Sequence, residues 1–185
     1  MMLTIDSVSG WLQNAVHVAS PNFDDRPCGC EPELIVVHGI SLPPGEFGGP
    51  GIDQLFTNSL AAHEHPYYAE IAHMQVSSHV LIRRDGSLTQ YVPFTKRAWH
   101  AGESHHCGRS GCNDFSVGVE LEGIDEASYE SPQYFALAAL VRALEGAYPS
   151  LRGADIVGHS DISPGRKTDP GPGFDWQRLA KLLSL

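Results

Sequence analysis

The chain has 185 residues, 42% hydrophobic residues and a formal net charge of −10. This composition is typical of one ordinary globular domain, and the acidic balance argues against a nucleic-acid-binding protein, which would carry a basic patch. Residues 1–6 lack the features of a secretory signal, and no apolar run approaches the length of a membrane-spanning helix. We therefore expect a single cytoplasmic domain over residues 1–185, with no nucleic-acid or membrane partner.

The N-terminal residues 1–33 contain several prolines and little periodicity, which predicts an extended arm packed on the domain, with a short strand around 11–18. The next run, 33–40, is almost continuously apolar and predicts a buried central strand. His38 lies at its C-terminal end, where open α/β sheets hold ligands and catalytic groups. A histidine that simply caps this strand in the core is an equally good interpretation.

Four cysteines, Cys28, Cys30, Cys107 and Cys112, form an even set. In a cytoplasmic protein they are expected to be free thiols. The first two could also form a second metal site with segment 105–107. Their spacing is not that of a zinc finger, so we do not expect such a site.

Residues 41–51 are rich in proline and glycine and predict a loop over the same sheet edge, either a rim or lid or a plain connection. Short helices are expected over 52–60 and 66–72. Three histidines of this region have no second signal beside them and are expected to be surface or capping residues: His63, His65 and His73.

Two β-rich runs, 79–84 and 87–92, flank an Asp-Gly pair and predict a hairpin. The following loop, 97–102, contains Trp99, which either packs in the core or forms one wall of a ligand cleft.

A further strand is predicted over 115–123, and its alternation separates two faces. Val117, Val119 and Leu121 share one face, and Ser116, Gly118, Glu120 and Glu122 share the other. Acidic side chains on a central strand need a partner, water or a chemical role, so Glu120 and Glu122 are of interest. Gly118 indicates that another group approaches the backbone closely.

The last third of the chain predicts two helices and a strand. Ser131 is the expected N-cap of an amphipathic helix that ends at Tyr148-Pro149, and Asp175 is the expected cap of a helix over 176–183. Between them, a strand over 155–158 leads to His159. Strands and helices mix without strict alternation, which predicts a three-layer α/β (α+β) domain with a central mixed sheet flanked by helices.

The loop that follows His159 combines residue types suited to metal-assisted chemistry. His38, His159 and Asp169 could bind one zinc ion and leave a coordination position open, as in catalytic sites. Glu120 could transfer the proton of an attacking water, and Lys167 could stabilise an oxyanion. These parts predict metal-assisted amide hydrolysis, although ten histidines allow other pairs to be drawn.

Four blocks of the sequence resemble the type-2 zinc N-acetylmuramoyl-L-alanine amidases, whose fold is shared with peptidoglycan-recognition domains. They are residues 34–45, 97–102, 112–123 and 166–172, and the resemblance runs from about Trp11 to Leu179. It implies the same zinc ligands, Glu120 as general acid/base and Lys167 as transition-state support. It further implies substrate contacts from Trp99, His100, Arg109 and Ser163.

The resemblance also implies a substrate and a setting. The family cleaves the amide bond between the lactyl group of the muramic sugar and L-alanine. The cytoplasmic branch, which this chain resembles most, takes small 1,6-anhydromuropeptides released in cell-wall recycling and influences β-lactamase induction. We expect such an enzyme to act as a monomer.

The chain departs from close relatives at three positions, Gly39, Gln75 and Gly111, where asparagine and two arginines are common. Arg109, two residues from Gly111, is a candidate to replace the second arginine in holding the stem peptide. Three alternatives remain open: an amidase of intact peptidoglycan, a non-catalytic recognition module, and a metal-free hydrolase.

Overall fold

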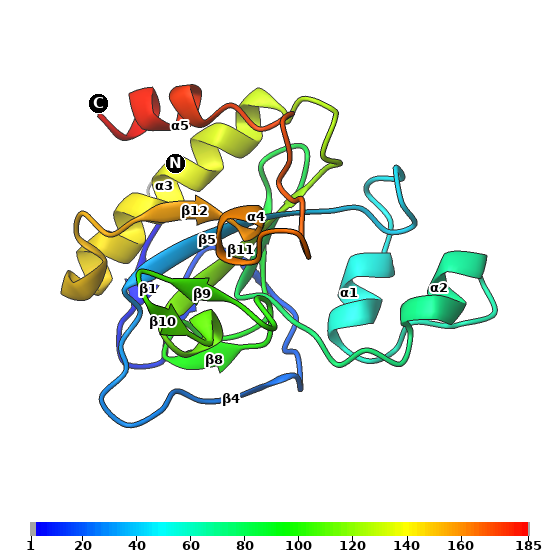
Figure 1. The fold of residues 1–185 in the computed structure, drawn as a ribbon, viewed down its shortest axis with the longest axis horizontal. Helices are drawn as coiled ribbons and strands as arrows, with labels where there is room; N and C mark the ends of the chain where they lie inside the picture. The colour runs from blue at the N-terminus through cyan, green and yellow to red at the C-terminus, as the bar shows by residue number, and fades with distance from the viewer. Residues whose placement is uncertain (1–2, 185) are drawn as a thin grey trace.

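The computed structural model describes residues 3–184, and a six-stranded mixed sheet lies at its centre (Figure 1). The strand order is β12-β5-β11-β6-β7-β3. The bounds are β3 Val16–His17, β5 Leu34–Ile40, β6 Val80–Ile82, β7 Leu88–Gln90, β11 Ser116–Glu122 and β12 Ile156–Gly158. Strands β12, β5, β11 and β6 are parallel neighbours, whereas β6 and β7 form the predicted antiparallel hairpin. The sheet is therefore mixed, as predicted.

Two helices cover one face of the sheet, α3 (Ser131–Ala147) and α5 (Trp176–Leu183), which lie side by side in Figure 1. Buried side chains of β11 and α3 share one hydrophobic cluster, including Val117, Val119 and Leu137. The alternation predicted for β11 is confirmed. The cap predicted for α5 is also confirmed, because the Asp175 carboxylate accepts a hydrogen bond from the Arg178 amide at 2.9 Å.

The opposite face has two coverings, which complete the three-layer domain. Helices α1 (Gly51–Phe56) and α2 (Pro66–Ile71) share a cluster with Leu81 and Tyr91. Nearer β12, Leu34 and Val36 pack against Ile162 of the one-turn helix α4 (His159–Ile162).

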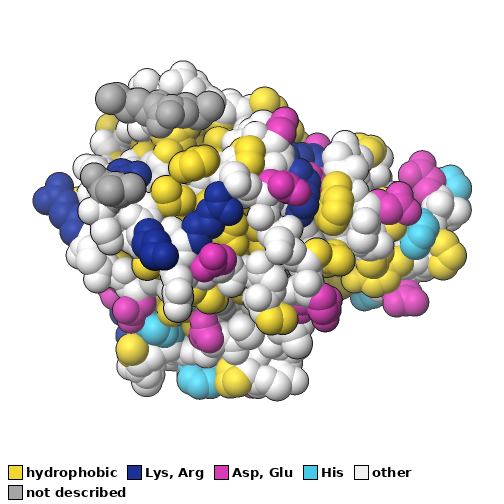
Figure 2. Space-filling view, turned by 90° about the horizontal axis from the view of Figure 1, so that it is seen from above, with side chains coloured by type: hydrophobic (Ala, Val, Ile, Leu, Met, Phe, Trp, Pro, Cys, Tyr) yellow, Lys and Arg dark blue, Asp and Glu magenta, His cyan; other side chains and the backbone are white. Residues whose placement is uncertain are grey.

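Helices α1 and α2 form an arm at one end of the molecule, and acidic and histidine side chains gather at its tip (Figure 2). His63 and His73 are exposed there. His65 caps α2, because its Nδ1 accepts a hydrogen bond from the Tyr67 amide at 3.1 Å. The prediction of surface and capping histidines is confirmed.

The N-terminal arm contains four short strands, β1 (Ile5–Asp6), β2 (Trp11–Leu12), β3 and β4 (Phe23–Asp25). A turn at residues 13–14 divides the single strand predicted over 11–18 into β2 and β3. Strand β4 pairs with β8 (Lys96–Ala98). Next to β4, the Arg26 guanidinium donates to the carbonyl oxygens of Asn113, Asp114, Phe94 and Ser116, and its burial lowers the pKa of Arg26 to about 10.

Other boundaries differ from the sequence predictions for local reasons. The N-cap of α3 is Glu130 rather than Ser131, because Gln133 reaches back and accepts a hydrogen bond from the Glu130 amide at 2.9 Å. Helix α4 occupies the start of the predicted loop after His159. The hairpin β9 (His105–His106) and β10 (Arg109–Ser110) and the short helices η1 (Cys112–Asp114) and η2 (Pro149–Leu151) were not predicted. Within residues 3–184, no helix combines the length and apolar character needed to cross a membrane.

Candidate metal centre and catalytic cavity

The parallel register of three strands brings the predicted site residues to one edge of the sheet. Glu120 of β11 is paired with His38 of β5. On the other side of β5, Gly158 of β12 is paired with Val37, so that His159 follows at the level of His38. Because parallel strands end at the same edge, side chains far apart in the sequence meet there.

Three donor atoms converge at this edge. Nδ1 of His38 lies 2.9 Å from Nδ1 of His159 and 3.2 Å from Oδ2 of Asp169, and the last two atoms are 3.1 Å apart. Two imidazoles and a carboxylate are a donor set that a borderline divalent cation accepts. The residues therefore fit a single metal ion, and they are the three predicted from the sequence.

The outer nitrogen of each histidine is held by a second contact. Nε2 of His38 lies 2.9 Å from Nδ1 of His100, and Nε2 of His159 lies 3.1 Å from the Ala101 carbonyl oxygen. Metal binding through Nδ1 requires the hydrogen of each ring on Nε2. The Ala101 carbonyl oxygen accepts that hydrogen from His159, and Nδ1 of His100 can accept it from His38. The His100 ring in turn contacts the Ser116 hydroxyl at 3.1 Å through Nε2.

The charge states suit the same purpose. Burial lowers the pKa of His38 to about 4, so that its imidazole is neutral near neutral pH. Burial alone would raise the pKa of Asp169, but its contacts with His159 and His38 outweigh this effect and hold the pKa well below its ordinary value. A neutral imidazole and an ionised carboxylate are the forms that bind metals.

Glu120 is the acidic side chain beside this centre. Its side chain is buried, with 8% exposure, and within residues 3–184 its Oε2 atom has no hydrogen-bond partner. Desolvation raises its pKa well above the ordinary value, and the nearby charge of Asp169 adds to this effect while Lys167 opposes it. The raised pKa makes the Glu120 carboxylate a stronger base than an ordinary one, which suits a group that exchanges protons with a molecule in the cavity.

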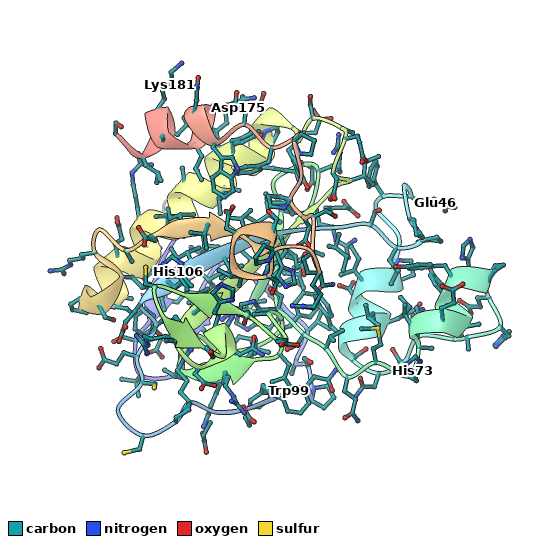
Figure 3. The ribbon with its side chains drawn as sticks, viewed as in Figure 1. Glu46, His73, Trp99, His106, Asp175 and Lys181 are labelled. Carbon is teal, nitrogen blue, oxygen red and sulfur yellow. The ribbon has the colours of Figure 1, made fainter. Side chains whose placement is uncertain are left out.

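A cavity of about 430 Å³ lies over the candidate metal centre. Its lining includes Lys167 and Trp99, two residues singled out from the sequence. Figure 3 labels Trp99 at the lower side of the molecule, near the loop that leads to β6. The arm formed by α1 and α2 adds Tyr67 and Met74 to the lining. Their side chains are 37% and 40% exposed, and the sequence did not predict that they line a cavity. Nothing in their sequence pattern distinguishes them from surface residues.

The other predicted substrate contacts lie elsewhere or do a different job. His100 lines the cavity, but its ring nitrogens are engaged by His38 and Ser116. Arg109 is not among the cavity-lining residues; its guanidinium pairs with Glu33 and lies 3.9 Å from the centre of the Phe115 ring. The structure does not bring Arg109 to this cavity.

Ser163 is also outside the cavity. Its hydroxyl donates to the Glu103 carbonyl oxygen at 2.6 Å and accepts from Nη2 of Arg166 at 2.8 Å. The Ser160 amide donates to the Asp169 carbonyl oxygen at 3.0 Å. These hydrogen bonds stiffen the segment that carries Lys167 and Asp169.

Two glycines are explained by close contacts around the site. A Cβ atom on Gly118 would lie 2.4 Å from Cγ of His100, which confirms the close approach predicted there. A Cβ atom on Gly39 would lie 2.3 Å from the hydroxyl of Tyr129, which donates to the Pro170 carbonyl oxygen at 3.0 Å. Gly39 therefore makes room for Tyr129.

The loop that follows β5 lies at the rim of the cavity, which Leu42 and Pro44 help to line. It is held to the sheet, because Glu122 accepts a hydrogen bond from the Gly48 amide at 2.6 Å and Arg83 donates to the Gly49 carbonyl oxygen at 3.0 Å.

Comparison with known proteins gives a consistent result. A family model described as N-acetylmuramoyl-L-alanine amidase matches residues 29–172. The 1,6-anhydro-N-acetylmuramyl-L-alanine amidase AmpD of Escherichia coli K12 is 58% identical over 175 residues, which cover 95% of this chain and 95% of that protein. A crystal structure of a selenomethionine derivative of AmpD superposes with a TM-score of 0.93 and 56% identity, covering 97% of this chain and 98% of its own. AmpDh3 of Pseudomonas aeruginosa, crystallised with an anhydromuramic pentapeptide, has a TM-score of 0.59 and 26% identity, over 84% of this chain and 61% of its own.

Proposed function

The chain belongs to the N-acetylmuramoyl-L-alanine amidase family, and from this membership we propose that it hydrolyses the lactyl–L-alanine amide bond of 1,6-anhydro-N-acetylmuramyl peptides. The name of the E. coli relative states this substrate, and that protein is similar along nearly the whole chain. The observation that carries the proposal is the meeting of three metal-binding side chains with Glu120 beneath one cavity.

The metal in this proposal is one zinc ion held by His38, His159 and Asp169. Two nitrogens and one carboxylate oxygen match the ligands of catalytic zinc sites, which use three protein ligands. When bound, zinc polarises a carbonyl oxygen and lowers the pKa of a water molecule.

Glu120 acts as the general acid/base. Its Oε2 atom has no hydrogen-bond partner among the described residues, and its pKa is raised, so it can take a proton from the attacking water. The same carboxyl group then returns that proton to the leaving amine of L-alanine, which would otherwise depart as an unstable anion. No other glutamate or aspartate that lines the cavity is as deeply buried among the described residues.

Lys167 supplies positive charge to the oxyanion that forms at the scissile carbonyl. Its backbone amide donates to the Ser163 carbonyl oxygen at 3.1 Å, so the side chain projects from a braced turn. Trp99 provides an apolar wall for the sugar or peptide.

We place this reaction in the cytoplasm, in the recycling of cell-wall fragments, and the enzyme acts as a monomer on a small molecule. The support is the sequence similarity to AmpD, whose name specifies the anhydro sugar that such fragments carry.

Mass spectrometry of the products tests the substrate, the bond and the metal together. Purified protein incubated with anhydromuramyl tripeptide should release the free tripeptide and the anhydro sugar. A chelator should stop the reaction and zinc should restore it. Unchanged substrate, or cleavage that persists after complete chelation, would contradict the proposal.

A matched comparison separates the rival substrate. Intact peptidoglycan sacculi and the soluble anhydromuropeptide are offered at equal amide concentration. Faster release from the soluble substrate is expected, because the cavity of about 430 Å³ suits a small ligand. Faster release from sacculi would favour an amidase of intact peptidoglycan.

A further inference from the structure

A second cluster of metal-binding side chains lies outside the catalytic cavity, at the opposite end of β12 from His159. It consists of His106, Cys107 and Asp155, whose ligand atoms all lie within 4.8 Å of one another. Figure 3 labels His106 beside the β9–β10 hairpin, near the start of β12. None of these three residues lines the catalytic cavity.

The distances in this cluster suit coordination to one ion. Nε2 of His106 lies 3.0 Å from Oδ2 of Asp155 and 3.4 Å from Sγ of Cys107. Zinc at ordinary bond lengths and tetrahedral angles would separate nitrogen from oxygen by about 3.3 Å and nitrogen from sulfur by about 3.6 Å. The catalytic donor atoms are 2.9 to 3.2 Å apart, so the two clusters are similarly compact.

The same contacts exclude a nucleophilic Cys-His-Asp triad. In such a triad the thiol and the carboxylate contact opposite nitrogens of the imidazole. Here both Cys107 and Asp155 face the same nitrogen, Nε2 of His106. Three donors directed at one point are the arrangement of a metal site.

The position of Cys107 in the hairpin is a second observation. The pairing of His106 with Arg109 leaves Cys107 and Gly108 as a two-residue loop, and both have positive φ, +47° and +77°. Asparagine, aspartate or glycine is preferred at the first position of such a turn. Cysteine is unfavourable there, which indicates that the thiol itself is of use.

We propose that His106, Cys107 and Asp155 form a peripheral site for a borderline-soft divalent cation such as Zn²⁺, with water completing the coordination. On binding, the Cys107 thiol releases its proton to solvent, because the thiolate is the ligand. The His106 and Asp155 side chains are 21% and 64% exposed, so an ion reaches the cluster from solvent. The ion ties the hairpin to the start of β12, the strand that delivers His159.

Cobalt titration of the full chain tests the site. A thiolate ligand gives Co²⁺ a near-ultraviolet charge-transfer band, and the catalytic donors include no sulfur. We expect this band as a second equivalent of Co²⁺ binds. Asp169→Ala should keep the band, because it removes only the catalytic site. Asp155→Asn should lower the affinity for the Co²⁺ ion that produces the band by at least about 10-fold. Loss of a residue that only contacts a metal ligand already lowers metal affinity by that factor, and Asp155 is proposed as a ligand itself.

Two variants at cysteines make the result specific. Cys107→Asn should abolish the band without unfolding the protein, because asparagine suits the turn. The Cys28→Ser, Cys30→Ser double variant should keep the band. Absence of a band in the wild-type chain, its persistence in Cys107→Asn, or its appearance only in large excess of Co²⁺ would overturn the proposal.

Discussion

Glu120 and Glu122 lie two residues apart on the same face of β11, yet only one of them has a full set of partners. The Glu122 carboxylate accepts hydrogen bonds from the Gly48 amide, the Arg83 guanidinium and the Arg84 amide at 2.6, 3.2 and 3.3 Å. Within residues 3–184, Oε2 of Glu120 has none. A buried carboxyl group without partners is costly, so its retention indicates a chemical role.

Glu120→Gln should therefore lose rate and keep stability. Removing a general acid/base costs about 10²- to 10⁴-fold in kcat. The neutral amide avoids burial of charge, so the protein should unfold at no lower urea concentration than the wild type at neutral pH. Metal content should be unchanged. Full activity in this variant, with metal bound, would refute the acid/base role.

Glu122→Ala should show the opposite combination. Removal of one partner of a buried ion pair costs about 3 kcal/mol. Here it leaves the Arg83 side chain, which is 16% exposed, with Asp53 as its one carboxylate partner among the described residues. Urea denaturation measures the loss. Replacing Arg83 by Met in the same chain should recover part of it, because the buried guanidinium is gone, while the Asp53 carboxylate is 33% exposed and keeps its hydrogen bond from the Tyr91 hydroxyl. A rate loss as large as that of Glu120→Gln would contradict this division of roles.

The sequence pattern could identify both glutamates but could not separate them. Alternation along 115–123 predicts which face each side chain occupies, because that depends on local geometry alone. The partners of Glu122 come from the loop after β5 and from the turn after β6, and contacts of this range leave no local pattern. Two of the candidate metal ligands were predictable, because His38 lies at the C-terminal end of an apolar strand and His159 directly follows another strand.

Other features depend on tertiary packing and could not be predicted. Arg26 is buried by the carbonyl groups of a distant segment, although its own surroundings in the sequence indicate a surface loop. Tyr67 and Met74 line the cavity only because the arm is placed beside it. Arg109 was expected at the substrate, but a charge pattern cannot show that Glu33 lies within reach.

Stability should fall in acid through buried histidines, and His79 offers a clear test. Burial lowers the pKa of His79 to about 3 from an ordinary value of 6.5. Between these pH values the unfolded chain binds a proton that the folded chain does not, so stability present above pH 6.5 is lost as the pH falls. One such proton contributes a slope of up to about 1.4 kcal/mol per pH unit.

The variant His79→Asn should reduce that slope, because it removes the titrating group and keeps an acceptor for the Gly118 amide. Urea denaturation of metal-free protein at several pH values between 4 and 7 measures the change. His63→Asn, the same substitution at an exposed histidine, is the matched control. Parallel curves for wild type and His79→Asn would contradict the assignment.

Asp169→Ala and Lys167→Met should separate metal binding from transition-state support. Asp169 contributes one of three donor atoms, so its removal should lose both metal and activity. Lys167 is not one of the three metal-binding side chains, so its removal should leave the metal content unchanged. Its kcat should fall about 10²- to 10³-fold, as for loss of an oxyanion contact. Metal analysis and kinetics of the same preparations test this. Metal loss in Lys167→Met would place the lysine in the metal site instead.

His100 should act as a positioning residue through His38, not as a substrate contact. Its Nδ1 lies 2.9 Å from Nε2 of His38 and can accept the hydrogen of that nitrogen, and its other nitrogen contacts the Ser116 hydroxyl. Loss of such an outer contact lowers metal affinity about 10- to 100-fold. His100→Leu should therefore bind zinc more weakly in chelator competition, and kcat should recover in excess zinc while KM stays the same.

A conservative variant distinguishes positioning from simple packing at this residue. In His100→Asn the amide oxygen can accept the His38 hydrogen, so zinc affinity should return towards the wild-type value, although the smaller side chain fills the space less well than leucine. Gly118→Ala should also weaken zinc binding, because its Cβ atom would lie 2.4 Å from Cγ of His100 and push that ring away from His38. Equal zinc affinity in His100→Leu and the wild type, with a raised KM, would return His100 to the substrate-binding role expected from the sequence.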